Sequence, residues 1–154
     1  MINNSIIDSP IDQRDTGKGN PNAILHFDRP LNNRQQKLLD MLEGYDSKTT
    51  INKKDVSMKD LSALTAVTGD EFAMFTKGQE RLIIRGSPKH VNVNIKYAKE
   101  LSEQGYKWSG HTHPGNGANV KLPSDGDILI LQQFAHENSV IYDWSGKYEK
   151  FSKY

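Results

Sequence analysis

The chain has 154 residues, of which 35% are hydrophobic and 25% charged, so one domain of ordinary size is expected and large metallohydrolase barrels are excluded. Lys and Arg number 20 and Asp and Glu 19, and the formal net charge of +1 supplies no overall attraction for nucleic acid or an anionic membrane. The absence of cysteine excludes disulfide scaffolds, cysteine nucleophiles and thiolate-ligated metal sites. A metal bound by this chain must use His, Asp, Glu or water.

The first part of the chain, residues 1–29, is rich in Asn, Asp, Gly and Pro and carries only scattered apolar side chains. This composition predicts a flexible arm or linker. The chain begins without a basic leader and apolar run, and it contains no stretch of 18 consecutive apolar residues, so neither a signal peptide nor a transmembrane segment is expected. We therefore expect the protein to act in the cytoplasm or to be delivered as part of a larger protein.

The next segment, residues 30–56, is expected to form an N-terminal helix followed by a connection. Pro30 suits the first helical position, and Gly44 is placed to end the helix. Four leucines lie on one face of such a helix: Leu31, Leu38, Leu39 and Leu42. The polar residues 45–56 then predict a connecting segment.

The remaining residues, 57–154, alternate between helical and strand patterns. The expected helices run from Ser57 to Gly69, from about Val91 to Gly105, and from Ser124 to about Ala135. The expected strands are residues 70–76, 81–85, 106–113, 138–143 and 147–152. This order predicts an α/β or α+β fold in which a mixed central sheet is flanked by helices.

The sequence His111-Thr112-His113, at the end of a predicted strand, is the clearest candidate for metal binding. Side chains two residues apart on a strand point to the same face, so the two imidazoles can converge while Thr112 points away. Asp127, in the first turn of the following helix, is the natural third ligand. Two imidazoles and one carboxylate leave a fourth tetrahedral position open, as in a catalytic zinc site.

Each part of this pattern also has an ordinary structural interpretation. Paired histidines on a strand are often plain surface or core residues, and the spacing Ser-x-x-Asp occurs four times in the chain, at Ser5–Asp8, Ser9–Asp12, Ser57–Asp60 and Ser124–Asp127. The last of these matches a capping box, in which both side chains bond backbone N–H groups. Helix capping and metal chemistry therefore compete for the same atoms. The other histidines, His26, His90 and His136, are not expected to bind metal; His136 is expected at a helix end, where a cation is favoured.

The combination of His111-x-His113-Pro114 with Ser124-x-x-Asp127, downstream of a strand that carries glutamate, resembles the signature of the JAMM (MPN+, JAB1/MPN/Mov34) metalloproteases. The resemblance covers about residues 57–154. It implies a cytidine-deaminase-like (MPN) architecture in which His111, His113 and Asp127 bind zinc. By the same resemblance, Glu71 is the general acid/base and Ser124 the hydroxyl that stabilises the tetrahedral intermediate.

Two details bear on this assignment. Asp70 and Glu71 would point to opposite faces of a strand, so a slip of one residue in register would exchange their roles. The loop of residues 115–123 is longer than the family usually has, and 116–119 looks like a small insertion. Because this loop borders the expected site, it bears on substrate access more than on metal binding.

The expected function is zinc-dependent hydrolysis of an amide bond by a peptidase or isopeptidase, in which Glu71 takes a proton from metal-activated water and delivers it to the departing amine. The resemblance implies a peptide or protein substrate, including ubiquitin-like linkages, and a carrier polypeptide, since JAB-type domains occur at the carboxyl ends of bacterial toxins and phage proteins. Nucleic-acid and membrane partners are not expected. The alternatives are an inactive MPN-type scaffold or binding module and a zinc hydrolase with a non-peptide substrate.

Overall fold

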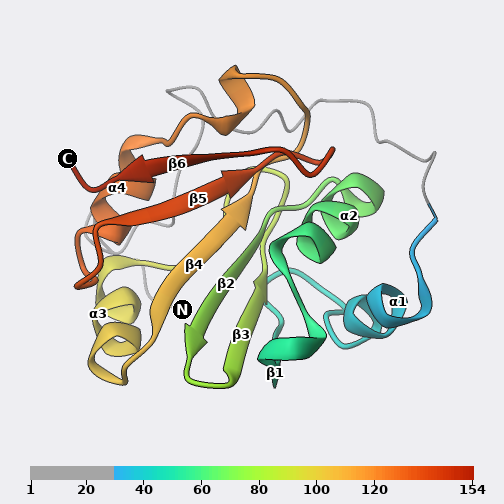
Figure 1. Cartoon of the computed structure of the whole chain (residues 1–154), viewed down its shortest axis with the longest axis horizontal. Coiled ribbons are helices and arrows are strands. Elements are labelled where there is room, and N and C mark those ends of the chain that lie inside the picture. The colour runs from blue at the N-terminus through green and yellow to red at the C-terminus, as the bar shows by residue number, and fades with distance from the viewer. Residues whose placement is uncertain (1–29) are drawn as a thin grey trace.

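A computed structural model describes residues 30–154, and the predicted arm, with His26, lies outside these described residues. The described chain forms a six-stranded mixed sheet flanked by helices (Figure 1), which confirms the predicted α+β class. The strands, in chain order, are β1 (Lys48–Asn52), β2 (Phe72–Lys77), β3 (Glu80–Arg85), β4 (Lys107–Thr112), β5 (Asn138–Tyr142) and β6 (Tyr148–Ser152). The helices are α1 (Asn33–Asp40), α2 (Met58–Thr68), α3 (Ile95–Glu103) and α4 (Asp125–Leu131), with short 3-10 turns η2 (Lys53–Asp55) and η3 (Asn119–Lys121).

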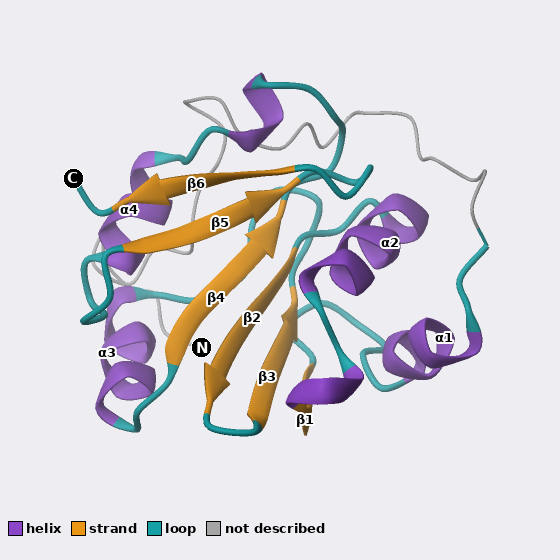
Figure 2. Ribbon diagram, in the orientation of Figure 1, coloured by secondary structure: helices purple, strands orange, loops and turns teal. Residues whose placement is uncertain are grey.

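The strand order across the sheet is β1-β3-β2-β4-β5-β6, and only the β4–β5 pair is parallel. Figure 2 shows α1 and α2 on one side of the sheet and α3 and α4 on the other. The central strand β2 accordingly has apolar side chains on both faces: Phe72 and Met74 pack with α1 and α2, and Ala73 and Phe75 pack with α3 and α4. Within residues 30–154, no helix is both long and apolar enough to cross a membrane.

Several predicted elements have different bounds in the structure. The segment expected to be a connection contains β1, which pairs with β3 at the edge of the sheet. The helix expected from about Val91 begins only at Ile95, because Val91 and Val93 are buried in the core and Asn94 caps the helix by accepting from Tyr97 N–H. The last helix, α4, ends at Leu131 and does not reach residue 135.

Strand β4 contains a β-bulge that determines the orientation of His111. Its register with β2 pairs Phe75 with Trp108, Met74 with Gly110 and Ala73 with His111, so one extra residue, Ser109, lies between two rungs of the ladder. Trp108 and His111 are three residues apart, a separation that places side chains on opposite faces of a regular strand. The bulge brings both to the same face, where their rings stack with centroids 4.8 Å apart.

Gly110, the residue after the bulge, is closely approached by its neighbours. A Cβ atom at this position would lie 2.7 Å from Val140 Cγ2 and 3.2 Å from Met58 Cε. A larger residue would therefore clash with Val140 of the neighbouring strand, just ahead of the histidine pair.

Candidate metal centre

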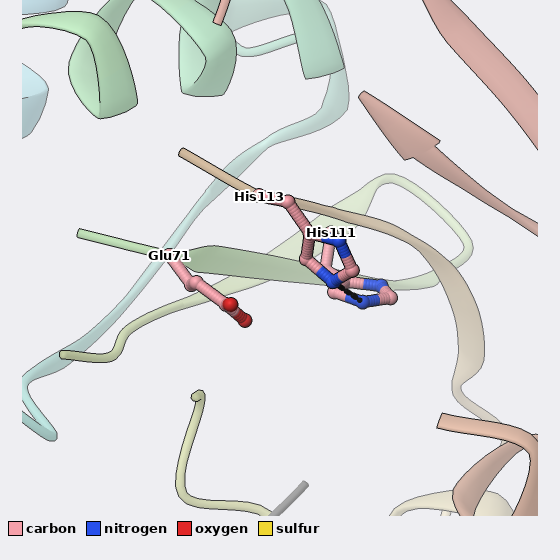
Figure 3. A group of neighbouring side chains, drawn as sticks. All are labelled: Glu71, His111 and His113. Atoms are coloured by element: carbon pink, nitrogen blue, oxygen red, sulfur yellow. Dashed lines mark hydrogen bonds between the residues drawn. The ribbon is translucent and has the colours of Figure 1, made fainter. Parts of the chain in front are cut away.

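Four side chains from three separate parts of the chain meet beside the carboxyl end of β4. His111 lies on β4 and His113 just after it, Glu71 immediately precedes β2, and Asp127 lies in the first turn of α4. All four residues are fully buried. Figure 3 shows the Glu71 side chain extending towards the two imidazole rings.

The alternation predicted for the strand is present. Thr112 points to the opposite face, where its Oγ1 lies 2.6 Å from Thr65 Oγ1 and accepts a hydrogen bond from Phe72 N–H at 2.9 Å. His111 and His113 therefore share one face, with their Nε2 atoms 3.0 Å apart and their rings at 72° to each other.

The carboxylate of Asp127 lies against both rings. Its Oδ1 is 3.2 Å from His111 Nε2, and its Oδ2 is 3.6 Å from His113 Nε2. A tetrahedral zinc site with bonds of about 2.0–2.2 Å has neighbouring ligand atoms roughly 3.3–3.6 Å apart. The separations are close to this range, and they use a different Asp127 oxygen for each ring, so the carboxylate lies near enough to each imidazole to share a small cation with it.

Glu71 belongs to the same cluster. One carboxylate oxygen of Glu71 and one ring nitrogen from each histidine lie within 4.8 Å of one another. The described residues thus offer two carboxylates for one pair of imidazoles, and Asp127 is in direct contact with both rings. The contacts of Asp127 with the rings and the nearby carboxylate of Glu71 give the cluster two acidic groups with different positions.

The structure also places Asp70 away from the cluster. Arg85 binds the Asp70 carboxylate through Nε at 3.0 Å and through its second terminal nitrogen at 2.9 Å. Burial raises the pKa of Asp70 even though the Arg85 guanidinium opposes this. The register of the strand therefore directs Glu71, and not Asp70, towards the histidines.

The capping box predicted at Ser124 and Asp127 is present at the start of α4. Ser124 Oγ accepts from Asp127 N–H at 3.0 Å, and Asp127 Oδ2 accepts from Ser124 N–H at 3.0 Å. The cap uses Oδ2, which also faces His113, and leaves Oδ1 facing His111, so capping does not occupy both oxygens of the carboxylate. The Ser124 hydroxyl, which accepts in the cap, still has its own proton to donate.

The ionisation of the cluster suits metal binding. Burial would raise the pKa of Asp127, but the adjacent imidazoles of His111 and His113 outweigh it and lower that pKa far below its usual value. Burial lowers the pKa of His113 in spite of the neighbouring Asp127. A carboxylate and a neutral imidazole are the forms in which these side chains bind metals.

The two rings are oriented by different means. His113 Nδ1 lies 2.6 Å from the carbonyl oxygen of Val120, which can only accept, so Nδ1 carries the proton and Nε2 presents its lone pair to the cluster. His111 is instead packed between rings, stacked on Trp108 and in edge contact with Phe151. No hydrogen-bond partner for His111 Nδ1 is found among residues 30–154.

His136 has a different role from the one expected. It lies beyond the end of α4, in the turn before β5, and its ring bridges two strands: Nε2 accepts from Trp108 N–H at 2.9 Å, and Nδ1 donates to Asn138 O at 2.9 Å. Both bonds together require the neutral ring, and burial lowers the pKa of His136. The expected helix-end cation is thus a neutral link between β4 and β5.

Sequence reasoning missed the residues behind His113. Val120 acts through its main-chain carbonyl, which no pattern of side chains in the sequence indicates.

Comparison with models of known protein families, with curated proteins and with solved structures finds no match for this chain. The features that bear on function are therefore the histidine motif and the geometry of the cluster.

Proposed function

We propose that the chain is a zinc-dependent metallohydrolase that cleaves an amide bond, a peptidase or isopeptidase of the JAMM type with the corresponding cytidine-deaminase-like (MPN) architecture. One observation carries the proposal: Asp127 contacts both imidazoles, one through each carboxylate oxygen, while a second buried carboxylate, Glu71, lies beside them. A structural zinc site needs no such additional base.

The residues present fit a zinc ion, and they have different roles around it. His111, His113 and Asp127 would hold zinc through Nε2, Nε2 and a carboxylate oxygen. When bound, zinc lowers the pKa of water towards neutrality and polarises the carbonyl under attack. Because the site is fully buried, charges within it interact more strongly than they would in water.

The remaining two residues act on the substrate. The Glu71 carboxylate accepts a proton from the attacking water and then gives it to the departing amine nitrogen, a shuttle that typically contributes about 10²–10⁴-fold in rate. The Ser124 hydroxyl donates to the oxygen on which negative charge develops. The substrate class follows from the resemblance, which implies a peptide or a ubiquitin-like linkage.

The test combines metal analysis with cleavage assays on peptide and ubiquitin-linked substrates. We expect wild-type protein to bind one zinc ion and to lose activity with a chelator. Glu71→Gln should keep zinc and lose at least about 10²-fold in kcat, because only the proton carrier is removed. His113→Ala should lose both zinc and activity, because a ligand is removed.

Glu149→Gln is the matched control, since Glu149 is an exposed glutamate on β6. It should change neither zinc content nor rate. Equal loss of zinc in Glu71→Gln and His113→Ala would contradict the division of roles. A protein without zinc and without chelator-sensitive activity would favour the scaffold, and activity confined to non-peptide substrates would favour the other zinc hydrolase.

A further inference from the structure

The loop of residues 115–123 is built into the metal centre. Its 3-10 turn η3 presents the Val120 carbonyl to His113 Nδ1 at 2.6 Å, and Val120 itself is buried. The loop that is longer than the family usually has therefore supplies, just after the apparent insertion at 116–119, the group that orients one of the two imidazoles.

A buried ion pair holds this turn in place. Lys121, the residue after Val120, has its Nζ 3.1 Å from Asp143 Oδ2 and donates also to Gly117 O at 2.9 Å. The Lys121 and Asp143 side chains are only 9% and 1% exposed. A buried ion pair of this kind contributes little to stability compared with apolar packing, but it tolerates few alternative geometries.

Asp143 is itself tightly fixed. Its Oδ1 accepts from Ser145 N–H, Ser145 Oγ–H and Lys147 N–H at 2.9, 2.7 and 3.1 Å. Burial would raise the pKa of Asp143, but these hydrogen bonds and the one from Lys121 lower it. The carboxylate is therefore a rigid, charged anchor for the lysine.

The anchor connects back to the strand that carries the histidines. Asp143 directly follows Tyr142 of β5, and Tyr142 O accepts from His113 N–H at 3.0 Å. His113 is thus held at both ends: its main chain by Tyr142, and its ring by Val120. The Lys121–Asp143 ion pair connects the residue after Val120 with the residue after Tyr142, so these two contacts of His113 are linked to each other.

We propose that Lys121 and Asp143 are positioning residues for the metal centre, which hold the Val120 carbonyl against His113 Nδ1 and so fix the tautomer that presents Nε2 to the metal. The proposal deepens the proposed function and rests on it for the identity of the metal. Partners behind metal-binding histidines typically change metal affinity by about 10–100-fold when they are removed.

The experiment measures two quantities on the full chain: the dissociation constant for zinc, by competition with a chromophoric chelator, and the His113 ring ¹⁵N chemical shifts of the metal-free protein. Lys121→Met should weaken zinc binding about 10–100-fold and turn His113 from one tautomer into a mixture. Lys121→Arg keeps a cation opposite Asp143 and should restore most of the affinity.

A second variant covers the case in which Lys121→Met does not fold. Asp143→Asn keeps an amide oxygen for Ser145 and Lys147 while removing the charge, and it should weaken zinc binding in the same direction. Arg34→Met removes an ion pair to Asp60 between α1 and α2 and should leave zinc binding and the His113 shifts unchanged.

The two proposals fail in different ways. If wild-type protein does not bind zinc, the proposed function fails, and the His113 nitrogen shifts alone decide the positioning role. If Lys121→Met and Asp143→Asn fold and leave the single His113 tautomer unchanged, the positioning role is wrong even where zinc binds.

Discussion

The chain uses the same four-residue motif at the start of two helices, with different results. Ser57 and Asp60 begin α2, and Ser124 and Asp127 begin α4. In both, the serine N–H donates to the aspartate Oδ2, at 2.8 and 3.0 Å, and the serine Oγ accepts from the aspartate N–H, at 3.4 and 3.0 Å. Both helices therefore begin with the same pair of reciprocal cap bonds.

The difference lies in what faces the other side of each carboxylate. Asp60 is bound by the permanently charged Arg34 and by Gln35 Nε2 at 3.0 Å, so its charge is compensated within the chain. Within residues 30–154, the groups on this side of Asp127 are the imidazoles of His111 and His113, which carry no permanent charge, and burial favours the neutral form of His113. A buried carboxylate without a permanently charged partner is costly. A divalent metal would supply the missing charge at Asp127, whereas Asp60 has no need of one.

Replacing the aspartate of each capping box with asparagine should give the largest difference in zinc affinity between the two boxes. Asparagine still offers a cap acceptor, but it removes the negative charge. Asp127→Asn should weaken zinc binding by more than roughly 100-fold and abolish cleavage, because a charged ligand is lost. Asp60→Asn should leave zinc affinity unchanged and lower the free energy of unfolding by about 1–3 kcal/mol. Calorimetry and urea unfolding measure both, and equal zinc affinity in the two variants would contradict this contrast.

The local parts of the fold were predictable from the sequence. The capping boxes mark the starts of α2 and α4, and Gly69, with φ of +76°, ends α2. Strand alternation predicted that His111 and His113 share a face and that Thr112 does not. Each of these features depends on residues within four positions of one another, so local sequence patterns are enough to predict it.

The features that depend on distant partners were not predictable. Strand β1 has no fully buried residue, because it lies at the edge of the sheet and gains its structure from pairing with β3. The close approach of Val140 and Met58 to Gly110, beside the bulge at Ser109, joins residues that are far apart in the sequence. The contact between Lys121 and Asp143 joins residues 22 positions apart, and neither residue type signals it.

Replacing each serine with alanine tests whether the capping box at Ser124 and Asp127 has a role beyond capping α4. Ser57→Ala and Ser124→Ala should each lower the free energy of unfolding by about 1 kcal/mol, the usual loss for an N-cap. Only Ser124→Ala should also lower kcat, by about 10²-fold with zinc content unchanged, as when one donor to a developing oxyanion is removed. An unchanged kcat in Ser124→Ala would restrict Ser124 to capping and leave oxyanion stabilisation to other groups.

The contribution of the Ser57–Asp60 capping box to stability should depend on pH, because the charged Arg34 side chain binds the Asp60 carboxylate. Burial would raise the pKa of Asp60, but hydrogen bonds from Arg34, Gln35 and Ser57 lower it below the value of 3.8 for a free aspartate. A carboxyl group whose pKa is lower in the folded chain than in the unfolded chain stabilises the fold at pH values above the unfolded pKa. This stabilisation is lost as the pH falls from 3.8 through the pKa of the group in the folded chain.

Urea unfolding of metal-free wild type and Asp60→Asn, followed from pH 7 to pH 2.5, measures this contribution as the gap between two curves. The gap should be constant from pH 7 to about pH 5 and should narrow below that, by about 1 kcal/mol because half-exposed Arg34 weakens the pair. A gap that stays constant to pH 2.5 would mean that the folded chain stabilises the charged form of Asp60 no better than the unfolded chain does. Compensation by Arg34 would then no longer distinguish this box from the one at Asp127.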